Sequence, residues 1–299
     1  MGGVAGPCLP QIRHGMMIKK QLLSNTSLST KAKSLVENRN KIIPICEADK
    51  QYDLVYILKE ADINPDLKMS LRSVAQFCTF KNIWLVGYKP NWVQNVKFLK
   101  TEQTGTKWQN AMINMIAACK CKDISEDFIL MNDDFFALDY IRDWKKSLNL
   151  CLGTLEKQVL LYSTKRNKSR WQYGFEYAID LLDKCGCNRH INYESHLPII
   201  FNRYKFLEMC EKPVIKDFLN TPKVLHRRSV YKNLYPDLDL EEPTKIRDVK
   251  ISIGRDLNDA WLHCNWLSVF DNVTENIRRY PRINKFLANM YPTKCEFEI

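Results

Sequence analysis

The feature that most constrains the fold is a regular alternation of short apolar runs with helical stripes between residues 52 and 131. Tyr52 to Leu58, Asn82 to Gly87 and Phe128 to Met131 are short runs of mostly apolar residues, and each predicts a buried strand. Leu67 to Phe77 and Thr104 to Cys119 carry apolar residues three or four positions apart, which predicts helices. Strands and helices that alternate with short connections predict βαβ units, and therefore an α/β fold with a mainly parallel sheet.

The third of these strands runs directly into an acidic turn. Four apolar residues precede Asn132, Asp133 and Asp134, and two aromatic residues follow. The carboxyl edge of an open parallel sheet is where ligands bind. Two adjacent carboxylates repel each other there and lose hydration, and a divalent cation relieves both costs. We therefore expect Asp133 and Asp134 to hold Mg²⁺ or Mn²⁺. The alternative is a turn that ends the strand and caps a following helix.

The second half of the chain has a less regular pattern. It predicts helices over 175–182, 203–211 and 281–290, and a loop over 190–201 that feeds a short strand. The segment 225–236 is basic and aromatic, and 250–253 predicts an edge strand. Asp256 and Asp259 are candidates for a late metal ligand or base, and an ordinary helix start is the alternative. This half is expected to wrap the sheet and supply the other wall of a cleft.

Composition excludes several classes of protein. A hydrophobic fraction of 45% and a charged fraction of 26% are those of a globular domain, not of a disordered or fibrous chain. No stretch approaches the roughly 20 apolar residues that span a bilayer, so we expect no integral membrane segment. The 11 cysteines are scattered and odd in number, which favours reduced thiols in a cytoplasmic protein. The net charge of +11 indicates a polyanionic partner: nucleic acid, nucleotide phosphates or an anionic membrane surface.

A series of short segments forms a second, ordered pattern. They are MSLRSV, NIWLVG with PNW, FILMNDDFF, HLP with Arg203, and the terminal FL, YP and FE (69–74, 82–92, 128–136, 196–203 and 286–298). In this order they resemble the Stealth-type sugar-phosphate transferases and related glycosyltransferases of the GT-A fold. One departure concerns the first strand, where the Stealth pattern ends in an acidic glycine turn and this chain reads YILKEAD over 56–62. This departure concerns the chemistry of sugar-phosphate transfer, and the resemblance to the GT-A fold does not depend on it.

The resemblance implies a GT-A-like α/β fold and a domain plan. Residues 1–45 are expected to be a flexible lead-in, and 46–299 a single catalytic domain. Within it, 46–150 would bind the donor and metal, and 151–299 would bind the acceptor in a mixed, helix-rich half that completes the cleft. The implied donor is a nucleotide sugar, with a UDP-sugar preferred.

Roles under the glycosyltransferase hypothesis follow from charge. Asp133 and Asp134 would hold the cation that neutralises the departing diphosphate, with Asn132 as a neutral ligand or orienting group. Four further residues are expected near the donor: Glu60 or Asp62 at the nucleoside, and Arg72 and Lys107 at phosphate. Glu194 and His196 are candidates to take the acceptor proton beside Asp134. The alternative for each is a surface or core residue without a chemical role.

Cations beside aromatic residues suggest the acceptor. A mixture of this kind suits phosphate contact with base stacking, and it is formed by Lys165, Arg166, Lys168, Arg170, Trp171, Arg203, His226, Arg227 and Arg228. With the net positive charge, this favours DNA, such as a hydroxymethylated pyrimidine in a phage genome that is modified in the bacterial cytoplasm. One alternative acceptor is a polysaccharide or a glycolipid precursor, with the basic face on anionic lipid. The other alternative is a nucleic-acid-binding protein without enzymatic activity.

Overall fold

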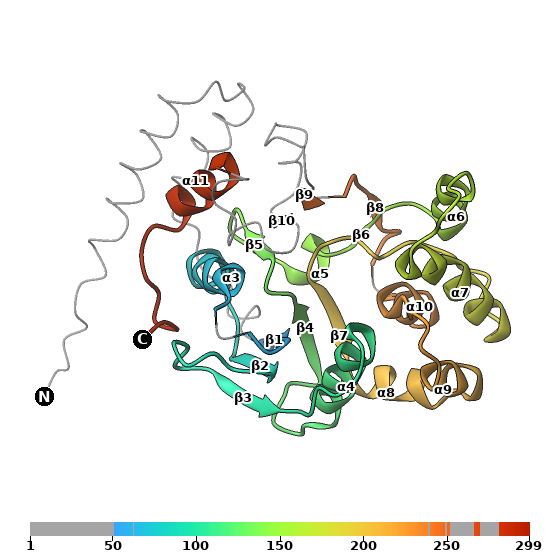
Figure 1. Ribbon diagram of the computed structural model, residues 1–299, viewed down its shortest axis with the longest axis horizontal. Helices are drawn as coiled ribbons and strands as arrows, with labels where there is room; N and C mark the ends of the chain where they lie inside the picture. The colour runs from blue at the N-terminus through green and yellow to red at the C-terminus, as the bar shows by residue number, and fades with distance from the viewer. Residues whose placement is uncertain (1–50, 62, 239, 249, 252–265, 270–280) are drawn as a thin grey trace, which may run out of the picture.

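A five-stranded sheet forms the centre of the molecule (Figure 1). The computed structural model describes residues 51–299 except 62, 239, 249, 252–265 and 270–280. The strand order is β3-β2-β1-β4-β7, with β1 and β2 parallel to each neighbour and β7 antiparallel to β4. The strands span Asp53–Ile57 (β1), Ile83–Gly87 (β2), Lys97–Lys100 (β3), Asp127–Met131 (β4) and Ile199–Asn202 (β7). The predicted α/β fold with a mainly parallel sheet is confirmed.

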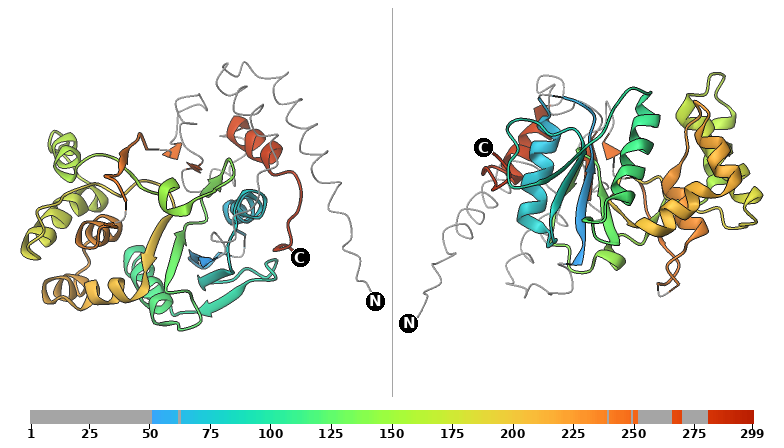
Figure 2. Two further views of the ribbon diagram at one scale, coloured as in Figure 1. Left: turned by 180° about the vertical axis from the view of Figure 1, so that it is seen from behind. Right: turned by 90° about the horizontal axis from the view of Figure 1, so that it is seen from below.

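Helices cover both faces of the sheet (Figure 2). Helix α3 (Pro65–Phe77) packs on one face, and α4 (Lys107–Lys120) lies on the other. Helix α3 begins where the side chain of Asn64 accepts a hydrogen bond from the backbone of Leu67, with Pro65 in the first turn. Helix α4 begins at a capping box of Thr106 and Gln109. Both start signals were available in the sequence.

Two hydrophobic clusters result from the alternation of side chains along the strands. Leu54 and Tyr56 of β1 point into a cluster with α3, whereas Val55 points into a cluster with α4. All three side chains are fully buried. The first cluster also takes in Leu287 of helix α11 (Pro281–Met290), which lies beside α3 in Figure 2. The sheet therefore has a core on each face, as a parallel sheet requires.

The second half adds a helical lobe beyond β7. It consists of α6 (Leu155–Ser163), α7 (Arg170–Lys184), α8 (Arg203–Glu211), α9 (Pro213–Leu219) and α10 (Arg227–Leu234). The remaining short strands form two small sheets, β5-β10-β9 and β6-β8. These short elements are β5 (Phe135–Ala137), α5 (Trp144–Ser147), β6 (Leu150–Cys151), β8 (Thr244–Lys245), β9 (Lys250–Ile251) and β10 (Trp266–Val269). The described helices include none that is long and apolar enough to cross a membrane. The predicted bounds of α8 and α11 are confirmed, whereas β3, β5 and α6 were not predicted.

Arg72 fastens the C-terminal segment to α3. Its Nε and Nη2 atoms donate to the two carboxylate oxygens of Glu298 at 2.6 and 2.8 Å, and Nη1 donates to the carbonyl of Tyr291 at 3.1 Å. Helix α3 starts at the carboxyl edge of the sheet. Arg72 is two turns further along the helix and therefore lies away from that edge. The expectation that Arg72 holds a donor phosphate is corrected, because its guanidinium is committed to a structural clamp.

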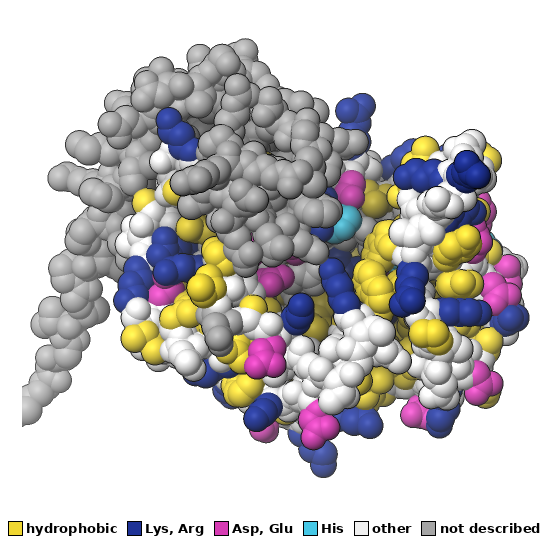
Figure 3. Space-filling view, in the orientation of Figure 1, with side chains coloured by type: hydrophobic (Ala, Val, Ile, Leu, Met, Phe, Trp, Pro, Cys, Tyr) yellow, Lys and Arg dark blue, Asp and Glu magenta, His cyan; other side chains and the backbone are white. Residues whose placement is uncertain are grey.

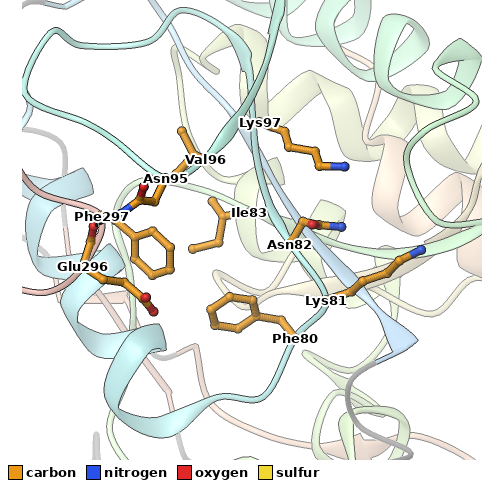
Figure 4. Close-up of a pocket in the computed structure, with 9 residues that line it drawn as sticks. All are labelled: Phe80, Lys81, Asn82, Ile83, Asn95, Val96, Lys97, Glu296 and Phe297. Atoms are coloured by element: carbon orange, nitrogen blue, oxygen red, sulfur yellow. Dashed lines mark hydrogen bonds between the residues drawn. The ribbon is translucent and has the colours of Figure 1, made fainter.

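A hollow of about 360 Å³ lies near this clamp (Figure 4). Phe80, Ile83 and Phe297 face one another across it, and Lys97 lies at its rim. Ile83 and Lys97 are the first residues of β2 and β3, which places the hollow at the amino edge of the sheet. It is therefore at the opposite edge from the acidic turn, and it contains none of the predicted site residues.

Replacing Arg72 by methionine is expected to lower the free energy of unfolding by about 2–3 kcal/mol at neutral pH. Burial opposes the charge of Glu298, but the hydrogen bonds from Arg72 hold the pKa of its carboxyl below the usual value. A carboxyl of this kind stabilises the fold above its unfolded pKa of about 4.3, and the contribution is lost as pH falls through the lowered folded pKa. Urea denaturation of both proteins at neutral and acidic pH measures this. Equal stability at neutral pH would contradict the clamp, and Lys81→Met on an exposed side chain is the control.

Candidate active site

The acidic turn joins two strands at the carboxyl edge of the sheet. Strand β4 ends at Met131, the backbone N–H of Phe135 donates to the carbonyl of Asn132 at 3.3 Å, and β5 begins at once. The alternative that the acids cap a following helix is therefore wrong. Asp134 is 5% exposed, and Asn132 and Asp133 are half-buried. Carboxylates this far from bulk water need positive charge or hydrogen-bond donors.

Asn64 orients Asp133 while it caps α3. Its Nδ2 atom donates to Asp133 Oδ2 at 2.8 Å, and its Oδ1 atom accepts from the backbone of Leu67 at 2.9 Å. The residue that caps α3 therefore also orients Asp133, the first acid of the turn. No site role was predicted for Asn64. The Asn-Pro pair before a helical stripe was the available signal.

Described residues engage one carboxylate oxygen of Asp134 and leave the other without a hydrogen bond. Its Oδ2 atom accepts from Ser268 Oγ at 3.1 Å and lies 3.3 Å from Lys250 Nζ. Its Oδ1 atom is buried, and no described residue makes a hydrogen bond to it. Leaving a buried carboxylate oxygen unpaired is costly, and a cation is a partner that would remove the cost. Neither Lys250 nor Ser268 was predicted, because both lie more than 100 residues along the chain.

The residues fit a Mg²⁺ or Mn²⁺ ion bound in an open site. The described residues contain no cluster of three or more His, Cys, Asp or Glu side chains that would hold a metal by itself. Mg²⁺ in phosphate-handling sites takes one or two carboxylates and completes its shell with water and substrate phosphates. Asp133 and Asp134 supply that number, with the Asn132 amide beside them. Asp256 and Asp259 lie outside the described residues.

The antiparallel strand β7 brings His196 to the same edge. Ile199, the first residue of β7, is paired with Leu130 near the end of β4, so the turn before β7 lies next to the acidic turn. His196 Nδ1 lies 2.8 Å from Asp248 Oδ2. Burial opposes the charge of Asp248, but the hydrogen bond from His196 holds the pKa of that carboxyl below its usual value. Asp248 therefore orients the ring, a role the sequence did not reveal because 52 residues separate the pair.

Glu194 has a structural role. Its carboxylate is buried at 7% exposure, and Oε1 accepts from the backbone N–H of Ser229 at 3.0 Å. Ser229 is the third residue of α10, so Glu194 satisfies an N-terminal donor of that helix. Oε2 lies 3.7 Å from Nδ1 of His226, whose pKa is lowered by burial. The prediction that Glu194 takes the acceptor proton is not supported by this placement.

Arg228 holds the turn that carries His196. Its Nη1 atom donates to the carbonyls of Ser195, at 2.8 Å, and Leu197, on either side of the histidine. The guanidinium also lies 5.3 Å from the ring centre of Phe135, directly after the acidic turn. Burial lowers the pKa of Arg228 to about 10. This arginine therefore connects the two turns from inside the protein.

Several residues predicted to bind DNA are committed to the interior, which corrects their assignment. Arg203 is 8% exposed and donates to the carbonyls of Cys121 and Ile124 at 2.6 and 3.2 Å. His226 is 1% exposed and bonds the Trp171 carbonyl at 3.0 Å. Three side chains predicted to contact DNA are therefore too buried to reach a duplex: those of Arg203, His226 and Arg228.

The remaining predicted acceptor residues lie nearer the surface. Trp171 is half-buried and stacks on Trp108 with ring centres 5.4 Å apart, and Arg227 is half-buried with its pKa lowered by burial. Lys168 is paired with Glu176 at 2.5 Å. The cations that stay exposed are Lys165, Arg166 and Arg170.

Two donor-side residues remain predictions. Glu60 follows β1 and Lys107 starts α4, so both come after strands at the carboxyl edge, and both are exposed. Lys107 lies 5.5 Å from the ring centre of Trp108. Asp62 lies outside the described residues.

Comparison with known proteins finds similarity only at the level of solved structures. No protein-family model matches the chain, and no curated protein matches it. Two structures of LgtC, one an active-site mutant and one a galactosyltransferase in complex with donor and acceptor sugar analogs, align with 82% of this chain and 98% of theirs, at 9% identity and a TM-score of 0.46. The bifunctional glycosyltransferase WbbM aligns over 77% of this chain and 47% of its own, at 9% identity and a TM-score of 0.44. At these values the likeness assigns no activity to this chain.

Replacing Arg228 by methionine is expected to lower the free energy of unfolding by about 2–4 kcal/mol, because two buried carbonyls lose their donor. Arg166→Met, on an exposed side chain of the same charge, is expected to change it by less than about 0.5 kcal/mol. Chemical denaturation of the two variants and the parent protein measures both effects. Equal stabilities would contradict the internal role of Arg228.

Proposed function

We propose that this chain is a metal-dependent glycosyltransferase that moves a sugar from a nucleotide-sugar donor to an acceptor hydroxyl. The observation that carries the proposal is the buried Oδ1 atom of Asp134, to which no residue in the described part of the chain donates a hydrogen bond. It lies beside half-buried Asp133 at the carboxyl edge of the sheet. The His196–Asp248 pair lies on the adjoining turn. The ordered segments that resemble GT-A glycosyltransferases include both turns, which supports the same reading.

The acidic turn would serve the leaving group. A divalent ion bound by Asp133 and Asp134 would supply positive charge against the diphosphate that departs from the sugar. Asn64 keeps Asp133 in place, and Lys250 balances part of the charge of Asp134. Because these contacts come from separate elements, the two carboxylates are oriented before any donor binds. Such preorganisation is what electrostatic stabilisation of a leaving group requires.

His196 would serve the acceptor. Its Nδ1 atom is held by Asp248, which leaves Nε2 as the atom that receives the proton of the attacking hydroxyl. The Asp248 carboxylate then stabilises the imidazolium that forms. Arg228 fixes the backbone on both sides of the histidine and limits its movement. The proton path therefore uses one side chain in contact with substrate and two that position it.

The burial of several predicted DNA-binding residues changes which acceptor class we favour. Hydroxymethylated DNA was the first expectation, but three of its contact residues are interior. The exposed cations that remain lie beside exposed leucines, a combination that suits an anionic lipid surface better than a duplex. We therefore place a polysaccharide or glycolipid precursor ahead of DNA as acceptor.

Calorimetric titration with UDP-sugars, with and without Mn²⁺, is expected to show binding that depends on the metal. Asp134→Asn should weaken it by at least about 10-fold, because one ligand loses its charge. Asp133→Asn, at a half-buried position, is a second variant in case the first folds poorly. Asp123→Asn, on an exposed acid before β4 at the opposite edge, should bind as the parent does.

Metal-independent binding, or equal binding by all four proteins, would contradict the role of the acidic turn. A protein that binds nucleic acid tightly and is unaffected by Asp134→Asn would instead be a binding module. Transfer assays with hydroxymethylated DNA and with glycan acceptors in parallel decide the acceptor class.

Replacing His196 by glutamine is expected to lower kcat by about 10²–10⁴-fold with little change in the KM of the donor. Asp248→Asn should lower kcat less, because it misorients the ring without removing it. His190→Gln is the matched control, since that histidine pairs with Glu156 and Asp183 on the helical lobe. Steady-state kinetics of the three variants measure the effects. A His196→Gln enzyme with parental kcat would exclude the proposed base.

A further inference from the structure

We propose that the tip of the α6–α7 hairpin is a docking surface for an anionic lipid membrane. The tip comprises the exposed face and carboxyl end of α6, the loop over 164–169 and the first turn of α7. Figure 1 places it at the far side of the helical lobe from β1. It is built from residues outside the acidic turn, so membrane binding can be tested separately from sugar transfer.

Two neighbouring leucines on this tip are exposed. Leu160 is 71% exposed and Leu161 is 63% exposed, although α6 packs against α7 along its other side. Neighbouring large apolar side chains at these exposures indicate a surface that meets an apolar phase or a partner. Figure 3 shows hydrophobic and basic side chains next to one another over the helical lobe.

Helical spacing sets cations around the leucines. Lys157, Leu161 and Lys165 are four residues apart in turn, so they share one face of the helix and its end. Arg166 and Arg170 follow in the loop and at the start of α7. Among the described residues, no acid forms an ion pair with Lys165, Arg166 or Arg170, so their charge faces outward uncompensated.

Two acids of the same hairpin already have partners within the protein. Glu176 pairs with Lys168 at 2.5 Å, and Glu156 lies 2.5 Å from Nδ1 of His190. The tip is therefore positive around an apolar centre. Anionic lipid complements both properties, because headgroups attract the cations and the acyl boundary accepts the leucines. A nucleic acid would complement only the charge and would leave the leucines without a partner.

The tip is connected to the candidate active site through the backbone. The N–H of Leu155, at the start of α6, donates to the carbonyl of His190, and the N–H of Asn192 donates to the carbonyl of Gly153, both at 2.8 Å. Residues 190–192 lead directly to the turn that carries His196. A membrane held at the tip would thus have a fixed orientation relative to that turn.

Vesicle co-sedimentation of the full chain tests the proposal. Binding is expected to phosphatidylcholine vesicles that contain roughly one third phosphatidylglycerol, and not to pure phosphatidylcholine. The Arg166→Gln/Arg170→Gln variant should bind about 25-fold more weakly, at about five-fold for each cation removed. The Leu160→Ser/Leu161→Ser variant should lose about ten-fold or more at unchanged charge.

A matched control separates this surface from overall charge. Lys120→Gln/Lys122→Gln removes the same charge from exposed positions at the end of α4 and should bind as the parent does. Circular dichroism confirms that each variant is folded. The proposal would be overturned by no vesicle binding, by equal binding of the leucine variant, or by duplex DNA binding that the arginine variant loses while neither protein binds vesicles. Self-association that the leucine variant abolishes, without vesicle binding, would also overturn it.

Discussion

The antiparallel pairing of β7 with β4 is the contact on which the candidate site depends. A parallel strand in this place would put the residues before it at the amino edge, far from the acidic turn. Because β7 runs the other way, its first residue, Ile199, lies beside Leu130, and the preceding turn meets Asn132 to Asp134. One reversal of direction therefore brings a carboxylate pair and a histidine to a common edge.

Charge balance then holds these groups in place. Asp134 is buried with Lys250 and Ser268 against one oxygen, while Arg228 reaches the histidine turn from the interior. Removing such groups from water costs free energy, and the hydrogen bonds between them recover only part of it. The oxygen of Asp134 that no described residue satisfies marks where the balance is incomplete. The proposed metal site rests on this incompletely balanced acid at a ligand-binding edge.

Periodicity allowed the first half of the fold to be predicted. The strands and helices from residue 52 to 131 follow the pattern of apolar residues, and the acidic turn was placed at the correct edge because strand ends determine it. Strand β3 was missed because its residues, Lys97–Lys100, lie at the sheet edge and are mostly exposed. Helix α6 was missed because Leu160 and Leu161 stand on its outer face and disturb the apolar stripe.

The partners within the site could not be predicted, because they are distant in sequence. Nothing local to Asp248, Lys250 or Ser268 indicates which side chain each will meet. The buried arginines present the same difficulty in reverse. In the sequence, Arg203 and Arg228 look like surface cations. Only the structure shows that they are buried and donate hydrogen bonds to backbone carbonyls.

The most direct test of the proposed metal site is a structure from crystals grown with Mn²⁺ and a UDP-sugar, with data collected at the manganese absorption edge. We expect an anomalous peak about 2.0–2.3 Å from a carboxylate oxygen of both Asp133 and Asp134, with the diphosphate oxygens completing the shell. Bound nucleotide with no anomalous peak at the acidic turn would contradict it.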